Sequence, residues 1–138
     1  MQKLRSKHVE GFTLIEALLT LSVMTFLTLA TSGSIKTIFN QVQNQLFFVT
    51  FEQVYRETQR LSASREKETV LRITDRYLEN PLGRYPVPDT VVLEKEQQLF
   101  FNQSGGNSSL AKIVFKASGE RITYQLYLGS GQYQKKKD

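Results

Sequence analysis

The residue with the most unusual setting in this sequence is an acid inside an apolar run. Glu16 is the only ionisable side chain between Phe12 and Ile35. A charge in a membrane segment is costly, so an acid at such a place is a functional candidate by default. Glu16 lies about one turn after the start of the run, where the positive end of a helix dipole favours a carboxylate. The chemistry that Glu16 offers is therefore electrostatic pairing, and the alternative is that it snorkels to water at the membrane interface.

Residue types that usually carry catalysis are scarce. The chain has no cysteine, and His8 is its only histidine. This excludes disulfides, thiolate metal sites and cysteine nucleophiles, and it leaves the chain after the leader without a Ser-His-Asp arrangement or a histidine metal site. The glycine-rich stretches Ser104–Asn107 and Gly129–Gly131 lack the lysine of a phosphate-binding loop, so we interpret them as turns. We predict no enzyme activity, no catalytic residue, no cofactor and no metal ion.

The apolar run that holds Glu16 has the length of a membrane span. Phe12–Ala30 comprises 19 residues, or about 28 Å of α-helix, which is close to the thickness of the hydrocarbon core. The leader Met1–Glu10 is mostly basic, which predicts a cytoplasmic N-terminus and a C-terminal part outside the cell membrane. A secretory signal peptide cut near Ala30–Ser32 is one interpretation. Its weakness is the length of the run, and a plain signal anchor is the second interpretation.

A third interpretation rests on the residues Gly11-Phe12-Thr13-Leu14-Ile15-Glu16 and the long apolar tail after them. They resemble the processing site of the type IV pilin and pseudopilin superfamily. The resemblance implies that a prepilin peptidase cuts between Gly11 and Phe12, that Phe12 is then N-methylated, and that Glu16 becomes the fifth residue of the mature chain. Glycine before the cut leaves the backbone open to the peptidase. Glu10 departs from the family pattern, in which a basic residue often precedes the glycine.

The same resemblance gives Glu16 a role in assembly. It implies that the Glu16 carboxylate meets the N-terminal amine of Phe12 on a neighbouring subunit of a filament. Such a pair is favoured in low dielectric over two separate unpaired charges. Glu16 would then set the register of each subunit as it leaves the membrane.

The helical pattern continues past the apolar run. Gly33 is the one weak point and a candidate for a bend. From Ile35 onward, apolar residues recur at helical spacing in two adjoining rows, which predicts an amphipathic helix that ends near Ser64–Lys67. The first row comprises Ile35, Ile38, Phe39, Val42, Leu46 and Val49, and the second comprises Phe47, Phe51, Val54 and Leu61. We expect the C-terminal half of the chain to cover this apolar surface.

That half changes to the alternation of apolar and polar residues that is typical of β-strands. We predict strands at Thr69–Thr74, Thr90–Glu94, Leu99–Phe101, Ile113–Lys116 and Arg121–Leu128, with turns at Asn80–Gly83 and Ala117–Glu120. The predicted fold is α+β and pilin-like: a long N-terminal helix, half transmembrane and half amphipathic, packed on a small antiparallel β-sheet. The predicted parts are the prepilin leader (1–11), the transmembrane and filament-core helix (12–34), the amphipathic helix (35–66) and the sheet domain with a basic C-terminal tail (67–138).

The closing segment ITYQLYLGSGQ, residues 122–132, resembles the end of one branch of the superfamily, the minor pseudopilins of the Gram-positive competence pilus of ComGD type. The resemblance implies a subunit of a DNA-uptake pilus, needed for pilus assembly and transformation and located in the cell membrane and at the cell surface. Its implied partners are the prepilin peptidase, the major and other minor pseudopilins, and the membrane machinery of pilus assembly. A pseudopilin of type II protein secretion is the alternative, because the N-terminal motif serves both systems.

The charge distribution raises a further alternative, a DNA-binding subunit at the pilus tip. The formal net charge is +5, and the basic residues gather at the two ends of the chain. Candidate phosphate contacts are Lys135, Lys136 and Lys137, supported by Lys112 and Arg121, with Tyr124, Tyr127 and Tyr133 as stacking surfaces. A lysine tail is more often simply a solvated end, so direct binding stays open at this point.

Overall fold

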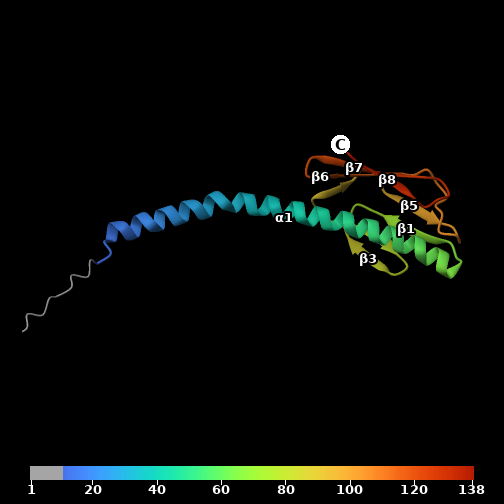
Figure 1. Cartoon of the computed structure of the whole chain (residues 1–138), viewed down its shortest axis with the longest axis horizontal. Helices are drawn as coiled ribbons and strands as arrows, with labels where there is room; N and C mark the ends of the chain where they lie inside the picture. Colours follow the sequence, from blue (N-terminus) through green and yellow to red (C-terminus); the bar gives the residue numbers. More distant parts are fainter. Residues whose placement is uncertain (1–10) are drawn as a thin grey trace, which may run out of the picture. The chain divides into compact units, whose positions relative to one another are not determined.

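The computed structural model describes residues 11–138 of the chain. The predicted leader up to Glu10, including His8, lies outside the described residues. The chain divides into two compact units, residues 1–37 and 38–138, and each is described by itself. One helix, α1 (Leu14–Arg65), contributes residues to both units (Figure 1). It ends within the predicted range, where Glu66 takes a positive φ of 48° and the amide of Lys67 donates to the carbonyl of Ser62.

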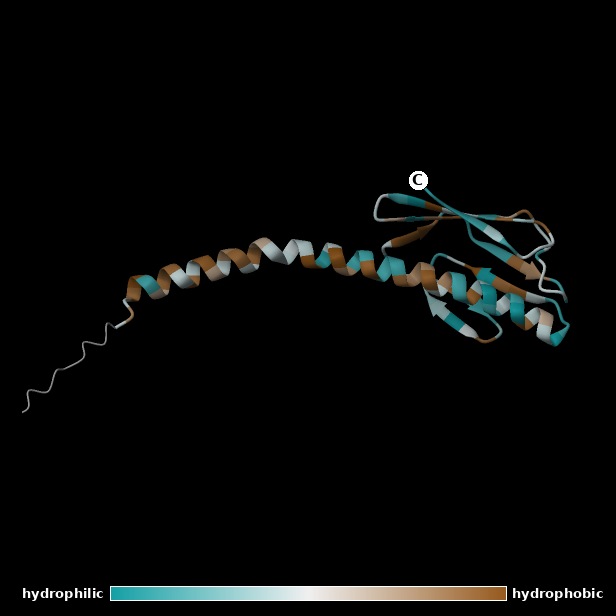
Figure 2. Cartoon of the chain, in the orientation of Figure 1, coloured by the Kyte–Doolittle hydropathy of each residue, from teal (hydrophilic) through white to brown (hydrophobic). Residues whose placement is uncertain are grey.

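The first unit consists of the N-terminal part of α1. All its described side chains, from residue 11 to residue 37, are exposed. Figure 2 shows mainly hydrophobic colours along this part of the helix and more hydrophilic ones toward Arg65. By its length and composition, α1 contains a stretch that could cross a membrane. Because apolar side chains on every side of a helix need an apolar surrounding, this segment has the surface of a membrane or filament-core helix.

The second unit contains two antiparallel four-stranded sheets. The first sheet has the order β3-β2-β1-β5 and the second has the order β4-β6-β7-β8. The strands are β1 (Thr69–Ile73), β2 (Tyr77–Asn80), β3 (Gly83–Pro86), β4 (Val91–Leu93), β5 (Gln97–Phe101), β6 (Lys112–Ala117), β7 (Glu120–Leu126) and β8 (Tyr133–Lys137). In Figure 1 the strands β6, β7 and β8 lie on one side of the C-terminal part of α1 and β3 on the other.

The core of the second unit is aromatic and is built around α1. The ring of Phe51 packs against Phe115 of β6 at a centroid distance of 5.2 Å and against Tyr124 of β7 at 4.7 Å. One turn later, the ring of Tyr55 packs edge-on against Phe101 of β5 at 5.1 Å. Both sheets therefore bury their inner faces against the same stripe of α1, and such aromatic pairs add to the free energy gained by burial.

The α+β prediction is confirmed, and the sheet is more elaborate than expected. The structure has two sheets in place of one, and three of its strands, β2, β3 and β8, were not predicted. The predicted turn at Asn80–Gly83 links β2 to β3, and Pro86 closes β3 at the edge of its sheet, where proline is tolerated. The predicted turn around Ser118 and Gly119 is also present. Both of these residues have positive φ, 54° and 80°, as a two-residue hairpin loop requires.

One expectation about exposure and one predicted strand boundary are wrong. The second predicted row of α1 is covered by the sheets, but the first row is not. Five of its members lie in the second unit and stay exposed: Ile38, Phe39, Val42, Leu46 and Val49. The strand predicted over Arg121–Leu128 ends earlier, at Leu126, and Leu128 beyond it is 60% exposed.

Candidate processing and assembly site

The predicted cleavage site precedes the first turn of α1. Gly11, Phe12 and Thr13 come before the helix, which begins at Leu14. Phe12 is 76% exposed, and a Cβ built on Gly11 would meet no atom within 4 Å. The peptide bond between Gly11 and Phe12 therefore lies before the helix, beside an exposed Phe12 side chain. Cleavage at this bond stays a prediction.

The Glu16 carboxylate closes the first turn of α1. Its Oε2 accepts hydrogen bonds from the backbone N–H of Thr13 and from Thr13 Oγ1, both at 2.9 Å. The Glu16 N–H donates back to Thr13 Oγ1 at 3.3 Å. Thr13 and Glu16 thus form a capping box, which satisfies N–H groups that a helix start leaves free. The capping role of Thr13 was not predicted, although Thr-x-x-Glu before an apolar run is the known signature of this motif.

Hydroxyl groups in the apolar part of α1 are satisfied within the helix. Thr20, Thr25 and Thr28 each donate from Oγ1 to the carbonyl four residues earlier at 2.8 Å. Such bonds allow polar side chains in a membrane helix. The helix is continuous through Gly33, around which a Cβ would meet no atom within 4 Å. The bend at Gly33 stays a prediction.

One apolar row of α1 is exposed, and another is covered by the sheets. Val42, Leu46 and Val49 follow one another at helical spacing and are 48%, 61% and 63% exposed. An exposed apolar strip of this kind marks an interaction surface. A groove of about 580 Å³ adjoins it, with Gln45 and Val49 on one side and Lys135 and Lys137 on the other. The second unit therefore carries an apolar surface that no other described part of the chain covers.

The three C-terminal lysines do not form a free tail, because they belong to β8. Lys135 Nζ lies 2.8 Å from Glu52 Oε1, and Lys137 Nζ lies 2.8 Å from Glu120 Oε2. Lys136 alternates to the other face of the strand, opposite Thr123 of β7. The structure thus does not bring Lys135, Lys136 and Lys137 together into one phosphate-binding group.

The three tyrosines proposed as stacking surfaces do not form one exposed surface, because the rings of Tyr124 and Tyr133 pack against each other at a centroid distance of 5.3 Å. Tyr124 is fully buried, and its hydroxyl donates to Glu52 Oε1 at 3.0 Å. Burial and the nearby Glu52 charge raise the pKa of the Tyr124 hydroxyl well above its ordinary value. Tyr133 is half-buried against the core, and only Tyr127 is exposed, at 46%.

Glu52 organises the charges on the inner side of β8. It accepts from Lys135 and Tyr124, and Arg56 lies 3.9 Å from its other carboxylate oxygen. Burial acts to raise the pKa of the Glu52 carboxyl, but the hydrogen bonds from Lys135 and Tyr124 and the Lys135 charge outweigh it, so the pKa lies below its ordinary value. Glu52 is a structural anchor for β8, and the sequence analysis did not single it out.

Residues 11–138 contain no group of three or more histidine, cysteine, aspartate or glutamate side chains that could hold a metal ion. Glu94 and Glu96 lie at the surface. Glu94 forms an ion pair with Arg121, whose Nη2 lies 2.9 Å from Glu94 Oε2. In this part of the chain the arrangement offers an exposed apolar surface on α1.

The comparison with known proteins decides the family. The chain is 38% identical over 130 residues to the competence protein ComGD of Streptococcus pneumoniae strain R6, and the match covers 94% of this chain and 81% of that protein. The chain belongs to the ComGD family of competence pseudopilins. No protein-family model matches the chain, and no solved structure matches it.

The family assignment confirms the predicted resemblance and the predicted function as a competence pseudopilin subunit. It does not favour the type II secretion alternative or the tip DNA-binding alternative. The apolar helix and the relative, which is named as a competence protein, fit a location in the membrane and the pilus. They also fit pilus components as partners. The pseudopilin's processing residues, topology and individual partners are taken up below as proposals.

Proposed function

We propose that this pseudopilin is a minor subunit of a DNA-uptake pilus, needed for pilus assembly and transformation. Its leader is cut off between Gly11 and Phe12 by a prepilin peptidase, and Phe12 is N-methylated. The segment from Phe12 to about residue 34 first spans the cell membrane, with the N-terminus cytoplasmic and the C-terminal unit outside. It later packs in the core of the filament, where the subunit is displayed at the cell surface.

The observation that carries this proposal is the surface of α1. All described side chains of residues 11–37 are exposed, and most of them are apolar. In the second unit, Val42, Leu46 and Val49 are also exposed. A bilayer can cover only about 20 residues of helix. The row beyond it therefore requires apolar protein surfaces, which neighbouring pseudopilins in a filament supply.

Glu16 has two partners in succession under this proposal. Before assembly, its carboxylate is held by the N–H and hydroxyl of Thr13 in its own chain. Cleavage before Phe12 creates a new α-amino group on Phe12, one residue before Thr13, which caps the helix. In the filament, the Phe12 amine of a neighbouring subunit can pair with the carboxylate, because an ion pair in low dielectric is favoured over two unpaired charges. Glu16 thus serves as the register residue for assembly.

The proposed partners follow from these steps. The prepilin peptidase acts on Gly11 and Phe12, the major and other minor pseudopilins pack against α1, and the membrane machinery of pilus assembly lifts the subunit from the bilayer. A structural subunit of this kind needs no catalytic residue and no cofactor.

The test is the N-terminus of the mature protein, determined by mass spectrometry in cells that express the peptidase. We expect a mature chain that begins with methylated Phe12. Gly11→Ala should block cleavage, because a side chain before the scissile bond hinders the peptidase. Gly33→Ala is the matched control, since its surroundings are equally open, and should be processed normally. A mature chain that begins near Gly33 would mean signal peptidase and would overturn the proposal.

The same cells test Glu16. Glu16→Ala should be processed like the native chain but should be absent from sheared pilus fractions, because its register contact is missing. Thr25→Ala is the control, because the Thr25 hydroxyl bonds only within its own helix, and it should still be incorporated. Normal incorporation of the Glu16 variant would refute the register role.

A further inference from the structure

The two sheets of the second unit have four edge strands, β3, β5, β4 and β8. β3 has four residues and ends at Pro86, which has no N–H to donate, and β4 has only three residues. β5 is covered by the loop that follows it, because Asn107 pairs with Phe101. Short strands, proline and covering loops are known protections of a sheet edge. Among residues 11–138, β8 is therefore the one edge strand of five residues that no other backbone covers.

β8 leaves one set of its backbone groups unpaired. Arg121 and Asp138 exchange two backbone hydrogen bonds of 2.9 Å, and such bonded pairs alternate with non-bonded pairs along an antiparallel ladder. Every second residue of β8 is therefore bonded to β7. The other residues direct their N–H and C=O groups to the open edge: Tyr133, Lys135 and Lys137. None of these six groups has a backbone hydrogen-bond partner among residues 11–138.

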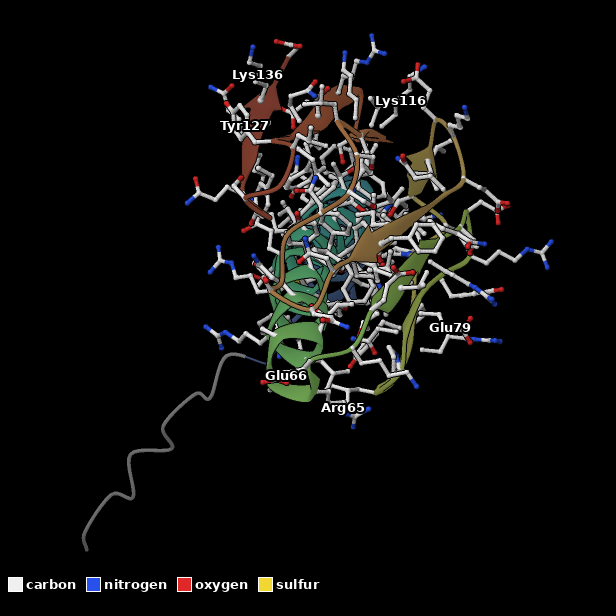
Figure 3. All side chains as sticks on the ribbon, turned by 90° about the vertical axis from the view of Figure 1, so that its right-hand side faces the viewer. Arg65, Glu66, Glu79, Lys116, Tyr127 and Lys136 are labelled. Atoms are coloured by element: carbon white, nitrogen blue, oxygen red, sulfur yellow. The ribbon has the colours of Figure 1, made fainter. Side chains whose placement is uncertain are left out.

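Lysines on an edge strand often keep it from pairing, but most of this charge is compensated on β8. Lys135 Nζ lies 2.8 Å from Glu52 Oε1, and Lys137 Nζ lies at the same distance from Glu120 Oε2. Lys136 is exposed on the other side of the strand and makes no ion pair among residues 11–138. In Figure 3 its side chain points away from α1. The edge of β8 is thus open to an added strand.

Two hollows lie between α1 and the open edge of β8. The larger one, of about 580 Å³, is lined by Phe48 and Val49 of α1 and by Lys137 at one end of the strand. The smaller one, of about 360 Å³, is lined by Tyr55 of α1 and by Tyr133 at the other end. Side chains of an added strand would point alternately toward α1 and away from it. Those that point toward α1 would enter these hollows, whose walls suit apolar side chains.

The cations around β8 favour an acidic partner. The Glu52 carboxylate serves two cations, because Lys135 Nζ lies 2.8 Å from one oxygen and Arg56 Nη2 lies 3.9 Å from the other. On the outer side, Lys136 has no carboxylate of its own, and an acid of an added strand could lie beside it, as opposite charges do across paired strands. A second copy paired through its own β8 is disfavoured, because lysine would then stand opposite lysine.

We propose that the open edge of β8 binds an extended acidic segment of another protein by strand addition. The backbone of this segment pairs with the outward N–H and C=O groups of Tyr133, Lys135 and Lys137. Its apolar side chains fill the two hollows against α1, and its acidic side chains lie beside Lys136. In this mode of recognition the backbone bonds provide affinity and the alternate side chains provide specificity. The proposal goes beyond the proposed function, since it requires only contacts of the second unit.

The experiment uses a short fluorescent peptide in which valine alternates with glutamate, added to the full-length chain in nanodiscs of zwitterionic lipid. We expect binding by fluorescence anisotropy, together with slower hydrogen exchange at the amides of Tyr133, Lys135 and Lys137. A peptide in which valine alternates with lysine should bind at least about fivefold more weakly. Absence of binding, or binding without slower exchange at these amides, would overturn the proposal. So would amides that are already protected before the peptide is added, which would mean that a second copy occupies the edge.

Methylation of the peptide backbone tests the strand pairing itself. Methyl groups on the valine nitrogens and on the glutamate nitrogens block opposite edges of the peptide, because alternate residues direct their N–H groups to opposite edges. Strand addition predicts that one of the two methylated peptides loses about tenfold or more in affinity and that the other retains it. Equal effects of the two methylations would contradict strand addition. This test needs no variant of the chain.

A matched pair of variants tests the edge from the side of the protein. Lys137→Pro removes an outward N–H without removing a bond to β7, and Lys137→Gln loses the same charge but keeps that N–H. The proline variant should bind the valine–glutamate peptide about tenfold more weakly, and the glutamine variant should stay within about twofold of the native chain. Thermal unfolding followed by circular dichroism shows whether both variants are folded. Equal affinities of two folded variants would overturn the proposal.

A second pair of variants tests the charge. Lys136→Glu should weaken binding of the valine–glutamate peptide by about fivefold and strengthen binding of the valine–lysine peptide. Lys116→Glu is the control, because Lys116 is also exposed but lies on β6, about 10 Å from β8. At about 150 mM salt, where screening acts over about 8 Å, it should stay within about twofold of the native chain. Equal effects of the two substitutions would mean that only the net charge matters and would overturn the placement of the peptide beside Lys136.

Discussion

At the residue scale, the contacts of Glu52 show how β8 is held to α1. Lys135 is 83 residues away in sequence, yet its Nζ lies 2.8 Å from Glu52 Oε1. Lys135 also lies over the rings of Phe48 and Tyr124, at 5.7 and 5.5 Å from their centroids. The ammonium is therefore bound both by a carboxylate and by aromatic faces. A strand as hydrophilic as YQKKK remains in the sheet because one of its lysines is fixed in this way.

This environment predicts the pH dependence of stability. The pKa of the Glu52 carboxyl is lowered in the folded chain, so the carboxylate stabilises the fold above the ordinary pKa of about 4.3. That contribution is lost as the pH falls through the folded pKa. Glu52→Gln keeps an acceptor for Tyr124 but removes the charge. We expect it to lower the free energy of unfolding near pH 7 by about 1 kcal/mol and to weaken the decline in acid.

The measurement is denaturant unfolding of the full-length chain in detergent between pH 3 and pH 7. Glu68→Gln is the control, because Glu68 is exposed and makes no ion pair among residues 11–138. It should follow the native curve. If the Glu52 variant showed the full acid dependence of the native chain, the charge of Glu52 would not be its source.

Some of these residues could be predicted from the sequence and others could not. Gly11, Phe12 and Glu16 stand in one contiguous motif, and Thr13 could have been found from its capping signature. Glu52 and Lys135 could not be paired, since their contact depends on the register of β8 against β7, a long-range property. Their residue types alone are also those of ordinary solvated surfaces.

At the element scale, the second half of α1 carries one apolar row that is buried and another that is exposed. The sequence predicted both rows, but helical spacing does not tell which row a sheet will cover. The sheets cover the row of Phe51, which has no exposed surface, and leave the row of Leu46 open. The two rows therefore have different tasks: one stabilises the unit and the other is available for assembly.

This division predicts opposite effects for two substitutions in α1. Leu46→Gln changes an exposed side chain, so the free energy of unfolding should stay within about 0.5 kcal/mol of the native value, while the variant should be depleted from sheared pili. Phe51→Ala removes a buried ring and should cost about 3–5 kcal/mol. Thermal unfolding followed by circular dichroism and immunoblots of pilus fractions would test both. A Leu46 variant that assembles normally would show that its row is not an interface.

Only some of the strands could be predicted from the sequence. β1, β4, β5, β6 and β7 were predicted because their apolar residues alternate. β2 and β3 have only four residues each, too few for an alternation to stand out, and β3 contains both Gly83 and Pro86. β8 has no apolar alternation at all. These strands form because neighbouring strands offer free hydrogen-bonding edges, which no local pattern records.

At the scale of the whole unit 38–138, two glycine-rich loops join the sheets at the C-terminal end of α1. The loop after β5 contributes Asn107, whose Oδ1 accepts from the N–H of Gly131 at 3.1 Å and whose carbonyl accepts from the N–H of Gly129 at 2.9 Å. The carbonyl of Gly131 accepts from the Tyr55 hydroxyl at 3.1 Å. Both loops were predicted to be turns. The structure adds that they bind each other and the helix, which fixes the two sheets to one another.

Gly131 is the residue at which this junction is most sensitive. Its φ is +65°, and an added Cβ would collide with the Gln59 side chain and lie 2.6 Å from the Gly105 carbonyl oxygen. Gln59 can move, but a backbone carbonyl in a locked loop cannot. Gly131→Ala combines left-handed backbone strain with overpacking, so we expect a loss of about 2–4 kcal/mol in the free energy of unfolding. Gly119→Ala is the control. Gly119 has a φ of +80°, so an alanine there meets the same backbone strain, but no atom lies within 4 Å of the added Cβ. This variant should lose only about 1 kcal/mol in the free energy of unfolding. Denaturant unfolding compares the two, and equal losses would mean that backbone strain alone, and not the meeting of the loops, sets the cost.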